Sequence, residues 1–346
     1  EFAVLLTDAN SERVEQVALE IIAKVSAPLT LQGLQVQSSA SIGAASFPRD
    51  AAKPEELLQR AEVAMYQAKE TRQSWVTYSA DADKFSLRRL TLLGELPRAL
   101  SQDEIVVYYQ PKIDLKTGTV VGVEALVRWL HPELGMIRPD EFIELTEVAG
   151  LIDELTRKVV TRSLAQVHEW DLMGIEIDVA VNLSARNFHD AGLADFIVEQ
   201  LELHSVHPSR LMLEITESQV VDDLDLAVSV LMTLNERGIR TSIDDFGTGF
   251  SSLTHLRQLP VHEIKIDRTF VGQMATKAND AVIVRSIVNL GHDLNLEVVA
   301  EGVEDEWTLG NLRDLGCDRA QGYYFQKAVP PAEIPAFVRQ LAGSAV

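Results

Sequence analysis

Charged and amide side chains occupy positions where this sequence predicts buried strands. Glu214 lies between two aliphatic residues in Leu213-Glu214-Ile215, and Lys265 lies in the same way between two isoleucines. Successive side chains of a strand point to opposite faces, so both residues are predicted to face away from the side that packs on helices. The same alternation selects seven polar residues on seven strand-like segments: Glu124, Asn182, Glu214, Asp244, Lys265, Glu301 and Gln321.

A shared interior for these side chains would be rich in oxygen ligands. Burying an unpaired carboxylate is costly, so several carboxylates in one interior require protons or cations. Oxygen donors without His or Cys favour Mg²⁺ or Mn²⁺ over zinc. The adjacent carboxylates of Asp244 and Asp245 suit a bridge between two metals, an arrangement used for in-line displacement at phosphorus. Lys265 could then hold or help to deprotonate the attacking water, and Arg128 could take a phosphate oxygen.

Two structural alternatives compete with this interpretation. Glu214 and Lys265 could form an ordinary buried ion pair, and an Asp-Asp pair before Phe246-Gly247-Thr248-Gly249 is also a common loop and helix-cap motif. Seven inward polar positions on seven strands are difficult to obtain from ion pairing alone. The number of positions therefore favours one common site.

After residue 104, the predicted strands that position these residues alternate with predicted helices. The predicted strands are 105–113, 120–129, 177–183, 211–216, 241–244, 263–266, 297–301 and 319–325. The predicted helices are 139–171 (as two helices), 191–203, 222–237, 250–259, 269–293, 305–316 and 331–341. Only residues 115–119 join the first two strands, too few for a crossover helix, so this pair should be antiparallel. The pattern predicts an α/β fold, a (β/α)8 TIM-like barrel with an antiparallel first strand.

A shorter α/β unit precedes the barrel. Residues 2–7 and 74–78 are apolar and strand-like, residues 34–47 alternate, and helical spacing occurs over 12–26 and from Pro54 onward. A leucine-rich helix over 82–100, predicted to break at Pro97, joins the two parts. We therefore expect a partial α/β domain over 1–80, a junction helix over 81–104 and the barrel over 105–346.

Composition excludes several classes of protein. The balance of 31 basic and 52 acidic residues, a net charge of −21, disfavours a polymeric nucleic-acid partner. Cys317 is the single cysteine, so no intrachain disulfide and no cysteine-based zinc site can form, which fits a reducing compartment. No apolar run approaches the roughly 18 residues that span a bilayer, and the start is neither a methionine nor a signal peptide. The chain is expected to be a piece of a longer protein, without membrane contact of its own.

Residues 86–346 resemble the EAL domain of bacterial cyclic di-GMP phosphodiesterases. The motifs that carry the resemblance are Tyr109-Gln110-Pro111, Glu124-Ala125-Leu126-Val127-Arg128-Trp129, Val181-Asn182-Leu183-Ser184, Leu213-Glu214-Ile215-Thr216-Glu217, Ile243-Asp244-Asp245-Phe246-Gly247-Thr248-Gly249-Phe250, Ile264-Lys265-Ile266-Asp267, Ala300-Glu301-Gly302-Val303-Glu304 and Gln321-Gly322-Tyr323-Tyr324-Phe325. Every position of the catalytic set matches the family pattern.

The resemblance implies a role for each matched residue. Glu124, Asn182, Glu214 and Asp244 would hold one Mg²⁺ or Mn²⁺, and Asp244, Asp245 and Glu301 would hold a second. Lys265 would contact the nucleophilic water, Gln321 and Glu304 would support the site, and Gln110 and Arg128 would lie against the dinucleotide. The loop from Phe246 to Leu253, which includes Gly247, Thr248, Gly249 and Phe250, would join the metal site to a dimer interface, with Glu217 as its anchor.

Residues 1–80 resemble the second half of a GGDEF domain, the module that makes cyclic di-GMP. Ser41-Ile42-Gly43-Ala44-Ala45 and Ala64-Met65-Tyr66-Gln67-Ala68-Lys69 match later segments of that family. The signature glycines and the first metal-binding strand are absent from this sequence, and Arg72-Gln73-Ser74 departs from the usual Gly-Arg-Asn. We therefore expect no cyclase activity from these residues and a structural or regulatory role.

The resemblance implies an enzyme that hydrolyses cyclic di-GMP to linear pGpG with two Mg²⁺ or Mn²⁺ ions in each active site. Two alternatives stay open: a slow or inactive cyclic di-GMP receptor module that signals to upstream domains, and a phosphodiesterase for other dinucleotides. The family further implies a homodimer through the EAL domain. A cytoplasmic bacterial location is expected, with any membrane anchor in upstream segments.

Overall fold

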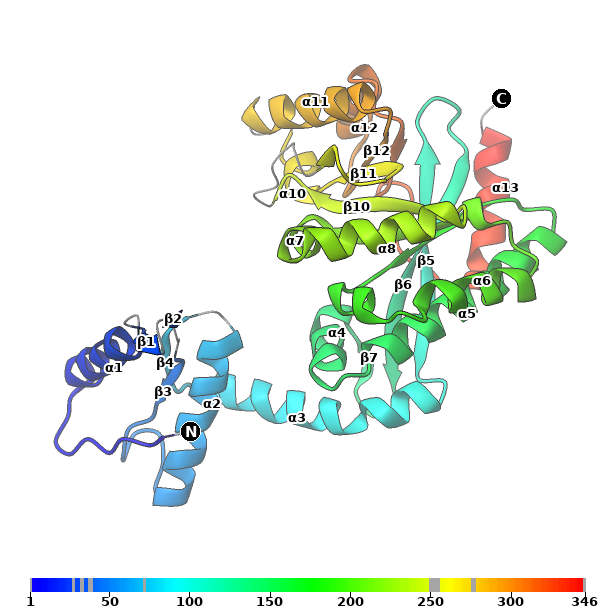
Figure 1. The fold of residues 1–346 in the computed structure, drawn as a ribbon. Helices are drawn as coiled ribbons and strands as arrows, with labels where there is room; N and C mark the ends of the chain where they lie inside the picture. The colour runs from blue at the N-terminus through cyan, green and yellow to red at the C-terminus, as the bar shows by residue number, and fades with distance from the viewer. Residues whose placement is uncertain are drawn as a thin grey trace. The chain divides into compact units, whose positions relative to one another are not determined.

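The computed structural model describes residues 2–26, 29–31, 34–36, 40–70, 73–248, 256–274 and 278–344. The chain separates into two compact units, Glu1–Gly94 and Glu95–Val346, and each is described by itself (Figure 1).

The larger unit is a closed barrel of eight strands. Around the barrel the order is β5, β13, β12, β11, β10, β9, β8 and β6, and pairing of β5 with β6 closes the ring. Their bounds are β5 Ile105–Asp114, β6 Val120–His131, β8 Asp178–Asn182, β9 Leu211–Thr216, β10 Arg240–Phe246, β11 Glu263–Ile266, β12 Glu297–Ala300 and β13 Arg319–Ala320. β5 runs antiparallel to both of its neighbours, and the other neighbouring pairs are parallel. The prediction of a TIM-like barrel with an antiparallel first strand is confirmed.

Helices cover the outside of this barrel (Figure 1). Their bounds are α4 Pro139–Val148, α5 Ile152–Leu172, α6 Leu193–Leu203, α7 Glu217–Asp222, α8 Leu224–Glu236, α10 Arg268–Val271, α11 Ala278–Asp293, α12 Glu306–Asp314 and α13 Ile334–Ser344, with 3-10 turns at Ala185–His189, Pro208–Arg210 and Pro331–Glu333. Outward strand residues such as Val179, Leu213 and Ile264 are fully buried beneath them. Burial of this aliphatic layer supplies the main driving force for folding the unit.

Several boundaries differ from the sequence prediction. The predicted strand 319–325 is only Arg319–Ala320, and a short strand β7, Gly135–Ile137, pairs with the end of β6. The predicted helix 222–237 is present as α8, which Asp223 caps with its side chain on the amide of Leu226, and the short helix α7 before it was not predicted. Most of the predicted helix 250–259 lies outside the described residues.

The smaller unit contains α1 Ser11–Val25, β1 Leu29–Leu31, β2 Leu34–Val36, β3 Ile42–Ala44, α2 Pro54–Glu70 and β4 Trp75–Thr77. β3 and β4 pair in parallel, and β1 pairs with β2. The expected strand over 2–7 is wrong: this segment has no strand partner among the described residues, and Phe2 and Leu5 are exposed. A strand without a paired neighbour leaves its backbone groups to water, so the apolar pattern alone does not form one.

Helix α3, Ala80–Ser101, runs through the division between the units. The predicted break at Pro97 is wrong, because the helix continues past the proline. Proline removes one backbone hydrogen bond, but Leu96, Ala99 and Leu100 are buried around it, and that packing offsets the loss. Near its end, Glu95 contacts the ring of buried His131 in β6.

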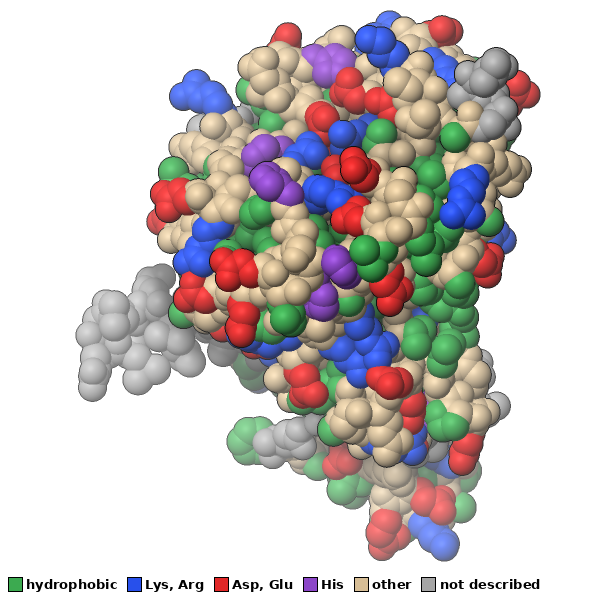
Figure 2. Space-filling model, turned by 90° about the vertical axis from the view of Figure 1, so that its right-hand side faces the viewer, with side chains coloured by type: hydrophobic (Ala, Val, Ile, Leu, Met, Phe, Trp, Pro, Cys, Tyr) green, Lys and Arg blue, Asp and Glu red, His purple; other side chains and the backbone are tan. Residues whose placement is uncertain are grey.

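On the face drawn in Figure 2, Lys and Arg side chains are interspersed with Asp and Glu side chains and form no continuous basic area. None of the helices in the described part of the chain combines the length and the apolarity that crossing a bilayer requires.

Candidate active site

The ammonium group of Lys265 lies inside the barrel among carboxylates. Its neighbours in β11, Ile264 and Ile266, turn to the outer layer, so strand alternation turns the lysine inward. Its Nζ atom lies 2.7 Å from Oε1 of Glu301, 2.9 Å from Oε2 of Glu214, 3.0 Å from Oδ2 of Asp244 and 3.6 Å from Oε2 of Glu124. The Glu214–Lys265 ion pair that sequence suggested as an alternative is therefore present, but within a larger cluster. Four carboxylates and one ammonium give a formal charge of −4 + 1 = −3.

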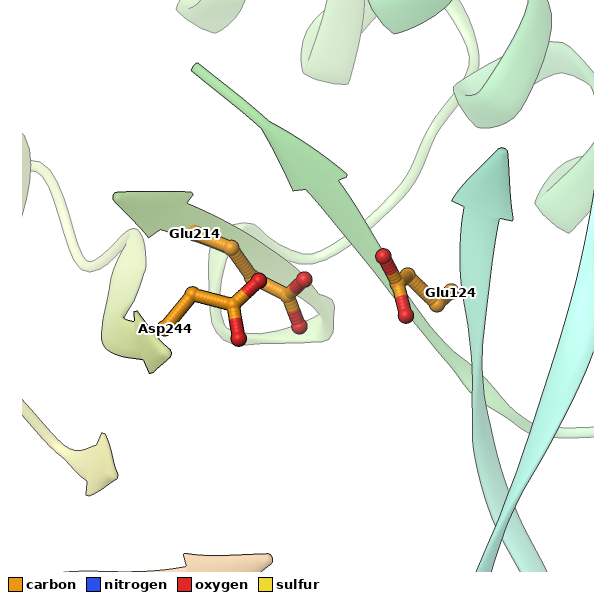
Figure 3. A group of neighbouring side chains, drawn as sticks. All are labelled: Glu124, Glu214 and Asp244. Atoms are coloured by element: carbon orange, nitrogen blue, oxygen red, sulfur yellow. The ribbon is translucent and has the colours of Figure 1, made fainter. Parts of the chain in front are cut away.

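Glu124, Glu214 and Asp244 form the first group of candidate metal ligands. One oxygen from each lies within 4.8 Å of the others, and all three residues are buried. Figure 3 shows Glu214 and Asp244 side by side on neighbouring strands, with Glu124 turned toward them from β6, which only β8 separates from β9. This spacing would allow a single cation to contact all three carboxylates.

Amide side chains orient Glu124. Asn182 donates to its Oε1 over 2.8 Å, and Gln321 donates to its Oε2 over 2.7 Å. Gln321 also donates to Oε1 of Gln110 over 3.0 Å, and Gln110 in turn donates to the carbonyl of Gln326. Oε1 of Gln321 is buried and has no hydrogen-bond partner among the described residues. A bound polar group or cation nearby would satisfy it.

A second group of ligands shares Asp244 with the first. One oxygen each from Asp244, Asp245 and Glu301 again lies within 4.8 Å of the others. Asp245 has a φ of 54°, in the left-handed region, and its amide donates to Oδ1 of Asp244 over 2.8 Å. This strained backbone directs two consecutive carboxylates toward one place, as functional sites often do.

The pKa values follow from burial and charge. Burial raises the pKa of Glu301 to about 8 despite the nearby Lys265. Burial, the charge of Asp244 and a hydrogen bond with Asp267 raise the pKa of Asp245 to about 6. Burial also raises the pKa of Glu124, and the adjacent carboxylates add to the effect. The excess of negative charge is thus costly without cations.

The pKa values of Glu214 and Lys265 shift in the directions that favour the charged form of each group. Burial by itself would raise the pKa of Glu214, but the ammonium groups of Lys112 and Lys265 lower it to about 2. Burial disfavours the ammonium of Lys265, yet the surrounding carboxylates hold its pKa well above the ordinary value. Glu214 is therefore an ionised carboxylate, available as a candidate ligand, and Lys265 is a hydrogen-bond donor at neutral pH.

Other predicted residues lie around the edge of this cluster. Arg128 is half-buried, donates to the carbonyl of Val127 and lies over the ring of Tyr108. Glu304 is exposed, and no hydrogen bond or ion pair joins it to the carboxylates in the described part of the chain. The structure therefore does not bring Glu304 into the cluster.

The loop after Asp245 is described as far as residue 248. Oε2 of Glu217 accepts a hydrogen bond from the amide of Gly247 over 2.8 Å, Phe246 is buried, and Thr248 donates to the carbonyl of Asp245. Gly247 has a φ of 100°, and a Cβ atom there would lie 3.0 Å from the ring of Phe270. Gly249 and Phe250 lie outside the described residues.

Three buried or capping residues were not found from the sequence. Lys112 and Glu263 extend the ion-pair cluster, because Lys112 pairs with both Glu214 and Glu263. Asp267 pairs with Asp245 and caps α10 through the amide of Thr269. Strand alternation offered a signal for the first two, since Lys112 is two residues after Gln110 and Glu263 two before Lys265.

The fold and this site define a TIM-like barrel whose carboxylates and amides gather around a buried lysine. The chain belongs to the EAL-domain family: residues 93–328 match the family model of the EAL domain. Residues 1–74 match that of the diguanylate cyclase, GGDEF domain, of which the chain contains a part.

Named relatives support this assignment. The chain is 39% identical over 340 residues to the bifunctional diguanylate cyclase/cyclic di-GMP phosphodiesterase MucR of Pseudomonas aeruginosa, covering 98% of this chain and 50% of MucR. It is 36% identical over 341 residues to the cyclic di-GMP phosphodiesterase NbdA of the same organism, covering 98% of this chain and 44% of NbdA. The chain thus spans about half the length of the curated relatives it matches.

Solved structures show the same barrel. The PaMucR phosphodiesterase in complex with c-di-GMP is 43% identical, with a TM-score of 0.68 over 70% of this chain and 99% of that one. The EAL enzyme Bd1971, bound to cAMP and cyclic di-GMP, is 28% identical with a TM-score of 0.69, over 85% of this chain and 77% of that one.

Proposed function

We propose that this chain hydrolyses cyclic di-GMP to linear pGpG in a reaction that depends on two divalent metal ions. The observation that carries the proposal is the pair of oxygen-ligand groups that share Asp244 beside Lys265. Two metals about 3.5–4 Å apart that share a carboxylate are a recurrent arrangement for displacement at phosphorus. Relatives named as cyclic di-GMP phosphodiesterases support the choice of substrate.

The residues of the cluster fit Mg²⁺ or Mn²⁺. Glu124, Asn182, Glu214 and Asp244 would hold one ion, and Asp244, Asp245 and Glu301 the other. All donors are oxygens, the net charge of the cluster is negative, and burial together with neighbouring carboxylates raises the pKa values of Glu124, Asp245 and Glu301. When bound, the metals would polarise the phosphate, lower the pKa of water and stabilise the leaving oxygen.

The chain's own residues would bind and orient the reactants. Lys265, held as an ammonium, would donate a hydrogen bond to the attacking water and so fix its position rather than accept its proton. Gln110 and Gln321 would hold Glu124 in place and present polar groups to the dinucleotide. Arg128 would bind a phosphate oxygen. We assign to Glu304 a supporting role that depends on substrate or metal drawing it inward.

The test is incubation of the purified chain with cyclic di-GMP and Mg²⁺ or Mn²⁺, followed by chromatographic detection of pGpG. Product should form with either metal, disappear with EDTA and be absent for the isosteric variant Glu124→Gln. Absence of pGpG from folded, metal-loaded protein would contradict the proposal. Cyclic di-AMP assayed in parallel separates a general dinucleotide phosphodiesterase from a guanine-specific one.

A binding measurement, combined with the pGpG assay, tests the receptor alternative. Calorimetry with Ca²⁺, whose larger and more flexible coordination supports this chemistry poorly, measures binding apart from turnover. Tight binding of cyclic di-GMP without pGpG in Mg²⁺ or Mn²⁺ would favour a receptor module that signals to upstream domains. The solved FimX EAL domain bound to c-di-GMP, 25% identical to this chain, motivates this second candidate.

The proposal extends to the organisation of the chain. We propose a GGDEF-derived segment over 1–80 without cyclase activity, a junction helix over 81–104 and the phosphodiesterase barrel over 105–346. A homodimer through the barrel, near Phe250 and the segment after Lys265, is part of the same proposal. Light scattering at several protein concentrations tests the dimer, and incubation with GTP tests the absence of cyclase activity.

A further inference from the structure

A second lysine is buried next to the carboxylate cluster. Lys112 lies on β5, and its side chain is 5% exposed. Its Nζ atom lies 2.6 Å from Oε1 of Glu214 and 3.2 Å from Oε1 of Glu263, and both glutamates have fully buried side chains. Within the described residues these two carboxylates are its ion-pair partners.

The two oxygens of Glu214 are divided between the two buried lysines. Oε1 accepts from Lys112, and Oε2 accepts from Lys265 over 2.9 Å. Lys265 also contacts Glu124, Asp244 and Glu301, whereas Lys112 contacts none of these three. Lys112 is therefore the cation that Glu214 does not share with the rest of the site.

Further ion pairs hold Lys112 in place through its second partner, Glu263. Oε2 of Glu263 lies 3.3 Å from a guanidinium nitrogen of Arg319, and another nitrogen of Arg319 lies 2.9 Å from Oε1 of Glu297. This chain of alternating charges leads from Glu214 toward the start of β12 and fixes where the ammonium of Lys112 can lie. Through Lys112, this chain of charges orients the Oε1 atom of Glu214.

Stability by itself is a weak explanation for such a group. Replacing buried ion pairs by apolar residues of similar volume is often neutral or stabilising, because desolvation offsets the attraction. Partners that orient metal ligands, by contrast, commonly control metal affinity. A lysine on one oxygen of a candidate ligand, with the other oxygen directed to the site, has the geometry of such a partner.

The geometry points to Lys112 as a positioning residue that holds Oε1 of Glu214 and leaves only Oε2 for a divalent metal ion. This inference rests on the metal site of the proposed function. Glu214 would thus be a one-oxygen ligand, because its Oε1 is taken by Lys112.

The test compares Mn²⁺ binding by three forms of the whole chain, measured by calorimetry without substrate. The variant Lys112→Met/Glu263→Gln removes the ammonium and also the carboxylate that would otherwise be left with less compensation, so the barrel should still fold. Glu263→Gln is the matched control, because it keeps Lys112 on Glu214. We expect the double variant to bind Mn²⁺ about 10–100-fold more weakly, the range for partners of metal ligands. The control should stay within about twofold of the parent chain.

A second readout separates positioning from general damage. At saturating Mn²⁺ the KM for cyclic di-GMP of the double variant should match that of the parent, while the Mn²⁺ concentration for half-maximal activity rises. Parental Mn²⁺ affinity in the folded double variant would overturn the inference. Equal weakening in Glu263→Gln would also overturn it, because the ion-pair chain as a whole would then control Glu214. Failure of the parent chain itself to bind Mn²⁺ would instead contradict the proposed function.

Discussion

Replacing Glu124 with a neutral residue tests whether its carboxylate is a metal ligand or only a structural ion-pair partner of Lys265. The carboxylate lies 3.6 Å from the ammonium of Lys265 and within 4.8 Å of the carboxylates of Glu214 and Asp244. With an effective dielectric constant of about 20, the attraction amounts to about 4.6 kcal/mol and the two repulsions to at least about 3.5 kcal/mol each. The sum is a net repulsion of about 2 kcal/mol, which Lys112 reduces.

The variant Glu124→Gln keeps the shape of the side chain and removes this repulsion, and its new NH2 group requires the amide of Asn182 to turn its oxygen inward. In EDTA we expect the variant to be more stable than the parent by about 1–2 kcal/mol, or about 2–8 °C in Tm for a domain of this size. With Mn²⁺ the order should reverse, because the parent gains more from the metal than the variant does. Turnover should fall at least about 100-fold, since even partners of ligands cost up to that much.

The assay is thermal unfolding with EDTA and with Mn²⁺, combined with chromatography of pGpG. Asp171→Asn, a carboxylate-to-amide change in an ion pair with Arg210 outside the cluster, serves as the control and should leave the Mn²⁺ response unchanged. The reasoning is refuted if Glu124→Gln melts several degrees below the parent in EDTA and responds to Mn²⁺ as the parent does. That result would make Glu124 a structural partner of Lys265.

Three further predictions concern pH, the loop and the barrel core. The pKa values of Glu301 (about 8) and Asp245 (about 6) lie above the ordinary range, so both carboxyl groups contribute stability at low pH that is lost as pH rises through these values. The Tm of metal-free protein should therefore fall between about pH 5 and pH 8.5, and the gain from Mn²⁺ should grow; a flat response in EDTA, or one unchanged by Glu301→Gln, would contradict this. Gly247→Ala should cost at least about 1–2 kcal/mol in urea unfolding and reduce turnover, because a Cβ atom there is strained and meets an aromatic ring; full stability and activity would show that the turn adapts freely. Trp129→Phe removes the 3.0 Å hydrogen bond from the indole to Glu104 and should cost about 1–3 kcal/mol without changing Mn²⁺ affinity, which calorimetry would check.

Some features of the site can be predicted from local sequence patterns. Alternation along short strands is sufficient to turn Glu124, Glu214 and Lys265 inward, because their aliphatic neighbours must face the helices. The antiparallel first hairpin follows from the length of its connection, which cannot contain a helix. These features depend on residues within a few positions of one another.

Other features depended on contacts between distant segments. Lys112 faces inward by the same alternation, but that it pairs with Glu214 and Glu263 depends on the barrel's closure and on the register of strands that sequence does not fix. The helix through Pro97 survives because of tertiary packing, and residues 2–7 form no strand because the described residues offer them no paired neighbour. The exposed position of Glu304 likewise came from the path of the chain after β12.

The sequence by itself determined which residue types face the interior of the barrel, because that depends on strand alternation alone. Only the tertiary structure decided how their charges are shared, with Lys265 among four carboxylates and Glu214 between two ammonium groups. The physical reason is that electrostatic energy depends on distance and burial, and both are set when eight strands from 216 residues of chain close into one ring.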